Sequence, residues 1–294
     1  MGSSRGEVGQ VTKRIAVVVP TVRPETMHAF KAAWLAQFER HNALLVEVRD
    51  GAEPLVNGLT ASDLLGHDSD LICNHTDAVR NLGFAYVAKC VPDAEIIITL
   101  DDDTRPYGDT IGDHLDALAR RFPLSWMSTA SEYVRGVPYA VRDEAECVVS
   151  HGVWHGVADW DAPTQLIRGN PPVTFYKGAI PRGVLFPFCG MNVAFHRRML
   201  PWMYWAPMGP RMGVDRFGDI WLGIHLKRAC DERGWAIATG YAAVRHERAS
   251  NVWKNLQKEA VGLEMNEGYW LEEDSTAYGY QYRAMRERWA AVVR

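Results

Sequence analysis

The most constraining feature of this 294-residue chain is a short apolar run that ends in consecutive carboxylates. Residues 96–100 (IIITL) have the β-branched composition of a buried strand, and Asp101, Asp102 and Asp103 follow at once. In open α/β sheets, ligands bind at the carboxyl ends of the strands. We therefore expect these aspartates to lie at a ligand site on such a sheet.

Three adjacent carboxylates repel one another unless water or a divalent cation surrounds them. In an extended segment Asp101 and Asp103 point to the same side, so they could hold Mg²⁺ or Mn²⁺ through hard oxygen ligands. Such an ion would bind a diphosphate and neutralise the charge on a leaving nucleoside diphosphate. The alternative is a solvated acidic turn that caps a helix.

The rest of the chain alternates strand-like and helix-like segments. Strands are predicted at residues 15–21, 44–48, 96–100, 125–129 and 237–246, with strand-like pieces within 184–195. Helices are predicted at residues 25–40, 77–90, 110–122, 219–234 and 277–293, and a loop at 56–70. The early βαβαβ order indicates an α/β fold with a mainly parallel sheet and a mixed second half.

Composition and missing motifs exclude several classes of protein. The formal net charge is −4, which leaves no excess of basic residues for general nucleic-acid binding. The five cysteines lack CxxC spacing, which is typical of reduced thiols in a cytoplasmic protein and argues against a structural zinc site. We find no apolar run of membrane-spanning length and no signal peptide at the start. GxGxxG, the P-loop and GxSxG are also absent.

Outside the aspartate run, individual side chains have both functional and structural interpretations. Asp50 could accept a hydrogen bond from a base or ribose, or simply form an Asp-Gly turn. His246 could ligate a metal, and Asp219 could be a general base or a helix N-cap. Arg135 and Arg142 could neutralise a diphosphate, although surface arginines without such a role are common.

At this point longer motifs become informative, and together they resemble those of one family. They are VVPTVRP, RDG, LDDDT, RGVPYAVR, SHGVW, DWDAPTQLI, LFPFCGMNVAF, FGDIWLG and HERASNVWKNLQKE, in this order. The chain resembles the plant reversibly glycosylated polypeptides, which act as UDP-arabinopyranose mutases and form glycosyltransferase family 75. The Ala- and Arg-rich composition favours a bacterial member.

The resemblance implies a glycosyltransferase-A-type α/β sandwich. It indicates one catalytic domain at residues 13–294, preceded by a tag-like segment, residues 1–12, that we expect to be disordered. Within the domain we expect a nucleotide-binding half (about 13–130), a sugar and acceptor half (about 131–270) and a C-terminal helix (about 271–294).

Residue-level reasoning and the resemblance together assign the site. The nucleotide-binding candidates are Pro20, Thr21, Arg23, Asp50, Arg80, Asp101 and Asp102. The metal ligands for Mn²⁺ or Mg²⁺ are Asp101, Asp103 and His246. The catalytic candidates are Arg142, which matches the reversibly glycosylated arginine, and Asp219. The sugar and acceptor candidates are Arg135, His151, Trp154, Cys189, Gly190, Asn192 and Asp219.

We therefore expect a metal-dependent enzyme that cleaves the anomeric C–O bond of a UDP-sugar, with mutase or arginine self-glycosylating activity. A charged guanidinium is a poor nucleophile, so Asp143, Glu144 or Asp219 would have to take its proton. The alternatives are a conventional glycosyltransferase with a small-molecule acceptor and a non-catalytic nucleotide-sugar-binding scaffold. A homo-oligomer is a further expectation. This chain departs from the plant pattern at Gly218-Asp219, His196 and Asp143-Glu144.

Overall fold

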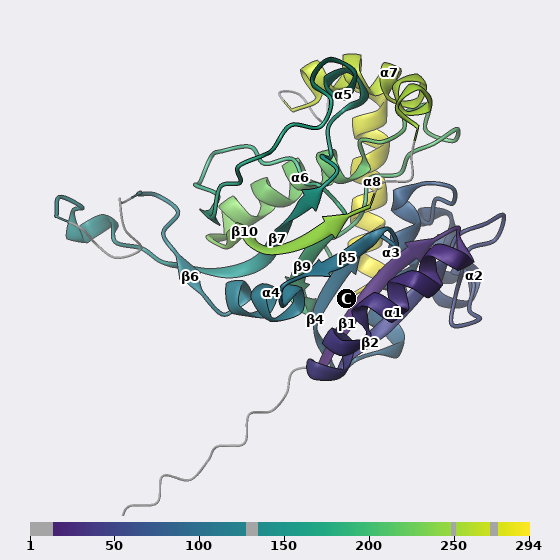
Figure 1. Ribbon diagram of the computed structural model, residues 1–294, viewed down its shortest axis with the longest axis horizontal. Helices are drawn as coiled ribbons and strands as arrows, with labels where there is room; N and C mark the ends of the chain where they lie inside the picture. The colour runs from purple at the N-terminus through teal and green to yellow at the C-terminus, as the bar shows by residue number, and fades with distance from the viewer. Residues whose placement is uncertain (1–13, 128–134, 248–250, 271–275) are drawn as a thin grey trace, which may run out of the picture.

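One mixed sheet runs through the computed structural model, which describes residues 14–127, 135–247, 251–270 and 276–294 (Figure 1). Its strands are β1 (Arg14–Thr21), β2 (Ala43–Arg49), β3 (Leu55–Val56), β4 (Ala94–Leu100), β5 (Thr104–Tyr107), β6 (Arg121–Phe122), β7 (Ala145–Gly156), β8 (Gly178–Ala179), β9 (Asn192–His196) and β10 (Ala236–His246). The strand order is β3-β2-β1-β4-β9-β7-β10-β5, with β6 beside β7 and β8 beside β10.

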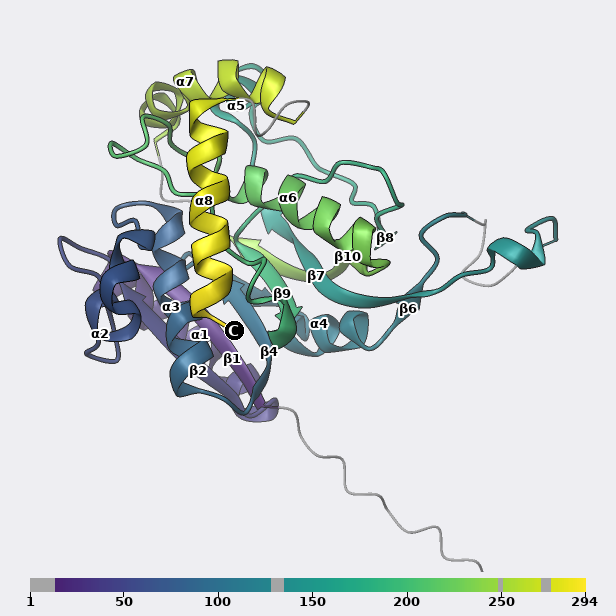
Figure 2. The ribbon, with the colours of Figure 1, turned by 180° about the vertical axis from the view of Figure 1, so that it is seen from behind.

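Helices cover both faces of the sheet. They are α1 (Pro24–Arg40), α2 (Ala61–Leu65), α3 (Arg80–Cys90), α4 (Thr110–Leu118), α5 (Ala162–Arg168), α6 (Gly218–Arg233), α7 (Val252–Tyr269) and α8 (Ala277–Val292). Short 3₁₀ helices are η1 (Gly66–Leu71), η2 (Asp77–Val79), η3 (Tyr139–Val141) and η4 (Arg197–Met199). Figure 2 shows α8 lying across the side of the sheet that also carries α3 and α6.

The first half of the sheet is mainly parallel, because β1 pairs in parallel with both β2 and β4, and only the short β3 is antiparallel, to β2. Alternate residues of β1 supply two cores: Val17 packs with Phe30 and Trp34 of α1, while Val18 packs with Leu82 of α3. This alternation is what lets the βαβαβ unit bury both faces of a strand. It also brings the carboxyl ends of β1, β2 and β4 to one edge.

The second half is mixed. Strand β9 runs antiparallel to β4 and β7, whereas β10 runs parallel to β7 and antiparallel to β5. Helix α4 packs in the same core as α1, and α6 and α8 pack in the other core, with α3. The predicted α/β class, with a mainly parallel first half of the sheet and a mixed second half, is thus confirmed.

Most predicted elements are confirmed with small boundary shifts, but four expectations differ from the structure. Residues 125–127 are not a strand, and residues 128 and 129 lie outside the described part. The predicted loop at 56–70 contains α2 and most of η1, and the helix predicted at 110–122 ends at Leu118 before β6. Only β9 forms within 184–195. The expected disordered segment 1–12 lies outside the described residues.

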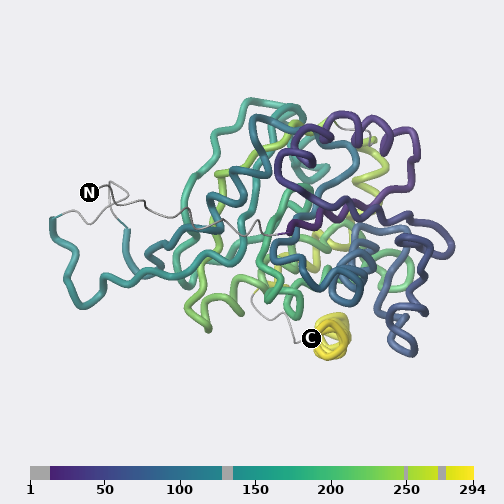
Figure 3. Tube along the Cα trace, turned by 90° about the horizontal axis from the view of Figure 1, so that it is seen from below, coloured from purple at the N-terminus to yellow at the C-terminus, as the bar shows by residue number. Residues whose placement is uncertain are grey.

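Residues 135–144 belong to an arm that follows β6 and projects away from the sheet (Figures 1 and 2). Figure 3, seen from below, shows the same teal segment standing clear of the body. Among the described residues, no helix combines the length and apolar character needed to cross a membrane.

Candidate functional site

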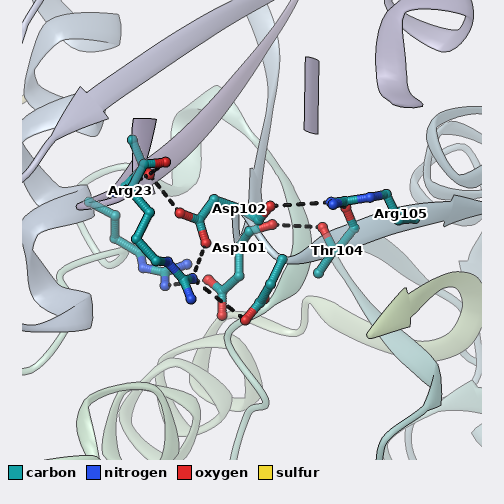
Figure 4. Close-up of polar contacts among 8 residues, drawn as sticks. Arg23, Asp101, Asp102, Thr104 and Arg105 are labelled. Carbon is teal, nitrogen blue, oxygen red and sulfur yellow. Dashed lines mark hydrogen bonds and ion pairs between the residues drawn. The ribbon is translucent and has the colours of Figure 1, made fainter. Parts of the chain in front are cut away.

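The aspartate run begins where β4 ends, beside the end of β1. Asp102, the central aspartate, points back into the protein and is only 4% exposed. It accepts hydrogen bonds from Thr21 Oγ1 at 2.6 Å and from a terminal guanidinium nitrogen of Arg23 at 2.5 Å (Figure 4). Both carboxylate oxygens are therefore used to join the loop after β1 to the loop after β4. Asp102 thereby positions Asp101 and Asp103. Pro20, another predicted nucleotide-binding residue, lies in β1 just before Thr21.

Asp101 is held by Arg80, which is 2% exposed at the start of α3. One terminal nitrogen of Arg80 donates to Asp101 Oδ1 at 2.8 Å, and the other donates to Thr99 Oγ1 and to the Gly190 carbonyl, both at 3.0 Å. Its guanidinium also lies over the Trp205 ring, 4.7 Å from the centroid. Arg80 is thus a buried cation that connects the aspartate run to residue 190.

Asp103 and His246 meet because β5 and β10 pair antiparallel, which sets His246 opposite Thr104. Burial and the neighbouring carboxylate of Asp101 raise the pKa of Asp103 to about 6. His246 Nδ1 lies 2.9 Å from the Val157 carbonyl oxygen, and Nε2 makes no hydrogen bond within the described residues. A carboxylate under repulsion beside an imidazole nitrogen is a donor set that suits a divalent cation.

The described residues contain no group of three or more His, Cys, Asp or Glu side chains arranged to hold a metal ion. Protein-bound Mg²⁺ commonly uses one or two carboxylates and completes its shell with water and substrate phosphates. The chemistry of Asp103, His246 and the second oxygen of Asp101 fits that mode of binding, in which the nucleotide completes the site. The metal assignment stays a prediction.

Asp50, at the end of β2, is engaged in its own loop. Its Oδ1 accepts the backbone N–H groups of Gly51 at 2.8 Å and His75 at 2.9 Å, and its own N–H donates to the Thr21 carbonyl. His75 has a left-handed φ of 57°. The Asp-Gly turn expected from the sequence is therefore present, and Oδ2 makes no hydrogen bond within the described residues.

A second acidic group lies on the other side of Arg80. Asp219, in the first turn of α6, accepts the N–H of Gly190 at 2.6 Å and that of Ile220 at 2.9 Å. Burial, with repulsion from Asp77 and Asp159, raises the pKa of Asp219 to about 8. Burial also raises the pKa of Asp77 to about 6.

We call Asp77, Asp159 and Asp219 the second acidic group. At neutral pH these values make Asp219 mainly a neutral acid and Asp77 mainly a carboxylate. Neither Asp77 nor Asp159 was assigned a role from the sequence. Asp77 is the first residue of a predicted helix, a position typical of an N-cap. The sequence pattern therefore gave no sign that Asp77 lies near Asp219. Asp159 lay in a family motif, DWDAPTQLI, without an assigned role.

The turn at residues 189–192 lies between the two acidic groups, and it contains Cys189, Gly190 and Asn192. A Cβ added to Gly190 would lie 3.0 Å from Asp219 Cβ and 3.1 Å from the Trp205 ring, so a side chain there would displace its neighbours. Burial and the carboxylates of Asp159 and Asp219 raise the pKa of the Cys189 thiol. Gly190 and Cys189 therefore lie beside Asp219, and their assignment to the sugar stays a prediction.

The other predicted sugar and acceptor residues are placed differently. His151 is 8% exposed and lies behind the turn, and Asn192, the last residue of the turn, is fully buried. Trp154 is 9% exposed and packs edge-on against Trp160 and Phe175. These three side chains support the site from the core and do not form its open surface.

Arg135 and Arg142 lie on the projecting arm, and the fold does not bring them to the aspartates (Figures 1 and 2). The Arg142 guanidinium donates to the Val137 carbonyl at 3.1 and 3.2 Å and stacks on Tyr139, 3.9 Å from the ring centroid. Tyr139 is itself 85% exposed. The catalytic role assigned to Arg142 stays a prediction.

Fold and site together define an α/β protein with two acidic groups, one at the end of β4 and one around the starts of η2 and α6, joined by a buried arginine. The chain belongs to the reversibly glycosylated polypeptide family, whose model matches residues 11–271. It is 32% identical over 285 residues to UDP-arabinopyranose mutase 3 of Arabidopsis thaliana, covering 87% of this chain and 75% of that protein. It is also 32% identical to the probable UDP-arabinopyranose mutase 2 of Solanum tuberosum, covering 92% and 78%. The resemblance found in the motifs is confirmed.

Solved structures similar to this chain are glycosyltransferases. A Drosophila β1,4-galactosyltransferase 7 complex with manganese, UDP-Gal and xylobiose aligns with a TM-score of 0.41 at 11% identity, covering 80% of this chain and 71% of that one. A glycosyltransferase involved in glycosylating the major capsid of PBCV-1 aligns with a TM-score of 0.34 at 11% identity, covering 85% and 98%. Both TM-scores are low, so the family assignment rests on the sequence matches alone.

Proposed function

We propose that this chain is a UDP-sugar-dependent enzyme that breaks the anomeric C–O bond to the diphosphate and interconverts pyranose and furanose forms of the sugar. The relatives named as UDP-arabinopyranose mutases support the substrate class. The observation that carries the proposal is the pairing of two acidic groups with different tasks through Arg80. One group suits a cation and a diphosphate, and the other can exchange protons with a sugar.

The diphosphate end is formed by the loops after β1 and β4. Arg23 and Arg80 are fixed by Asp102 and Asp101, so their remaining N–H groups are oriented before any ligand arrives. Asp103 and His246, with one oxygen of Asp101, would hold Mn²⁺ or Mg²⁺ here. That ion would neutralise the charge that develops on the departing UDP.

The sugar end is the second acidic group. In a five-carbon sugar the exchange balances in two steps: O4 attacks C1 and loses its proton as the bond from C1 to UDP breaks, and UDP then re-attacks C1 as the bond from C1 to O5 breaks and O5 gains a proton. Asp219 and Asp77 have pKa values of about 8 and about 6, which makes one an acid and the other a base at neutral pH. We infer that Asp219 donates to O5 while Asp77 accepts from O4.

A conventional glycosyltransferase is the second candidate, and the position of Arg142 favours it. Arg142 lies on the arm and not beside Asp219, so this arrangement of a single chain does not present Arg142 to the sugar. Asp219 could instead act on the hydroxyl of a separate acceptor once it is ionised.

The test is to incubate the protein with a panel of UDP-sugars and Mn²⁺ and to separate pyranose from furanose products by chromatography. We expect ring-isomerised UDP-sugar from the wild type, much less from Asp219→Asn, and an unchanged rate from Asp116→Asn, an exposed control on α4. Release of UDP only when an acceptor is added would favour the transferase. Nucleotide-sugar binding without turnover would favour a scaffold.

A further inference from the structure

Two successive backbone N–H groups in the 189–192 turn point in different directions. The N–H of Cys189 donates inward to Nε2 of His151 at 3.0 Å. The next N–H, that of Gly190, donates to Asp219 Oδ2 at 2.6 Å, and the Gly190 carbonyl accepts from Arg80. Gly190 therefore contacts Asp219 directly and is linked to the aspartate run through Arg80, and its direction depends on how Cys189 is anchored.

His151 is held in place on all sides, so it can serve as that anchor. Because the Cys189 N–H can only donate, Nε2 is the acceptor and Nδ1 carries the proton, which it donates to the Thr239 hydroxyl in β10 at 2.9 Å. The ring packs against Phe186 and Phe188, with centroids 5.0 and 5.2 Å away. Burial lowers the pKa of His151 to about 3, so the imidazole stays a neutral acceptor at any ordinary pH.

A second anchor holds the far end of the turn. Asn192 Oδ1 contacts Nε2 of the fully buried His114 at 2.7 Å, and Nδ1 of His114 contacts Ser150 Oγ at 2.8 Å. A Cβ on Gly152 would lie 1.9 Å from Asn192 Nδ2, so only glycine leaves space for this amide. The three residues that support the turn are consecutive in β7. Ser150 bonds His114, His151 accepts the Cys189 N–H, and Gly152 leaves space for the Asn192 amide.

We propose that His151 is a positioning residue: by accepting the Cys189 N–H it sets the direction of the Gly190 N–H, which orients Asp219 toward the sugar. This inference rests on the proposed function, because it assigns Asp219 a task in the reaction. In this proposal His151 acts through the turn at 189–192, whereas the sequence assigned it to direct contact with the sugar.

The proposal predicts which kinetic constant changes. Arg80 keeps its contacts with Asp101, Thr99 and the Asp77 carbonyl even if Gly190 turns away. UDP affinity should therefore be nearly unchanged. Asp219 retains only the Ile220 N–H and is free to rotate, and a catalytic group misplaced by about 1 Å can cost ~10²-fold in rate.

The experiment compares three variants by kcat, KM and thermal midpoint. We expect His151→Phe, which removes the acceptor but keeps a ring in the core, to lose ~10²-fold in kcat with little change in UDP affinity. His151→Gln can present an amide oxygen near the position of Nε2 and should recover most of that loss. The control, His225→Phe, removes a histidine that is 6% exposed and bonded to Tyr269 and Arg286, and it should lower stability without lowering kcat.

A second measurement reads the contact without turnover. The Gly190 amide proton in NMR spectra should lie far downfield and follow the ionisation of Asp219. The charged and titratable groups that face Asp219 are Asp77, Asp159, Arg80, Cys189 and Arg216. In His151→Phe the Gly190 resonance should move upfield and should no longer shift as Asp219 ionises.

The outcomes separate the two proposals. A wild type that turns over no UDP-sugar contradicts the proposed function, and the Gly190 resonance still decides whether His151 positions this peptide. A wild type that is active, with kcat and the Gly190 resonance unchanged in His151→Phe, overturns the positioning role and leaves the proposed function standing.

Discussion

Replacing Asp219 with asparagine tests whether this residue is a neutral acid at physiological pH. Asp219→Asn keeps the size of the side chain and one oxygen that can accept the Gly190 N–H, but it cannot ionise. If the neutral acid is the resting form, the substitution should leave the protein as stable as the wild type near pH 6. At higher pH the variant should be more stable than the wild type, because it has no buried carboxylate that ionises at this position.

The magnitude follows from the pKa. Asp219 has a pKa of about 8 in the folded protein against an ordinary value of 3.8, so the folded state binds the proton more tightly than the unfolded chain does. The resulting stability is complete below the unfolded pKa and is lost as pH rises through 8. Between pH 6 and pH 9 the free energy of unfolding falls by the equivalent of about two pKa units. At ~1.4 kcal/mol per unit, this is ~3 kcal/mol.

The assay is urea unfolding followed by tryptophan fluorescence at pH 6, 7, 8 and 9. We expect the free energy of unfolding of the wild type to fall ~3 kcal/mol more steeply over this range than that of Asp219→Asn. The exposed control Asp116→Asn should follow the wild type. Parallel curves for the wild type and Asp219→Asn would mean that Asp219 is already ionised at neutral pH, and its assignment as the acid would be wrong.

Three further substitutions address other parts of the site. Asp103→Asn should weaken Mn²⁺-dependent UDP binding, measured by calorimetry with and without a chelator, and unchanged metal-dependent binding would remove Asp103 from the ligand set. Arg142→Lys should abolish any sugar adduct on the peptide that contains this residue, measured by mass spectrometry after incubation with UDP-sugars. Full turnover in that variant would exclude arginine glycosylation from the mechanism. Gly218→Ala places a Cβ 2.9 Å from both Asp77 carboxylate oxygens, so it should cost about 1–3 kcal/mol in stability and lower kcat; equal kcat would argue against Asp77 as the base.

The parallel half of the fold was accessible from sequence because each element there has a clean local pattern. The strand at 96–100 is uniformly apolar and β-branched, and the helix at 25–40 repeats its apolar residues at helical spacing. Strand β7 gave no such signal. Its segment Ser150–His151–Gly152 is polar and small, because these residues support the turn at 189–192 and are satisfied by contacts that no local pattern reveals.

Helix α7 was missed for a related reason. Its first residues fall within a family motif that begins at His246, and that motif supported the resemblance without predicting any secondary structure. Asn251 caps the helix by accepting the N–H groups of Trp253 and Lys254, a local signal that could have located its start. Glu259, on this helix, bonds both Arg216 and the Ala162 N–H, which ties α7 to α5 and to the loop before α6.

The site was predictable as far as strand ends could place it. The aspartate run, Arg23, Arg80 and His246 come together because parallel strands end at one edge and β10 returns beside β5. The pairing of Asp77 with Asp219 was not predictable. It joins the start of η2 to the start of α6, two segments that only the tertiary fold brings together.

The charge balance at this edge explains why the two acidic groups need different partners. Arg80 and Arg23 are already paired with Asp101 and Asp102, so neither leaves a full positive charge for an incoming diphosphate. An anion approaching Asp103 would therefore meet net repulsion, which a divalent cation removes. A sugar is neutral and requires only hydrogen-bond partners, which the Asp77 and Asp219 carboxyl groups supply while one of them keeps its proton. The same excess of carboxylates can thus serve both ends of a nucleotide sugar, with a metal ion at one end and a bound proton at the other.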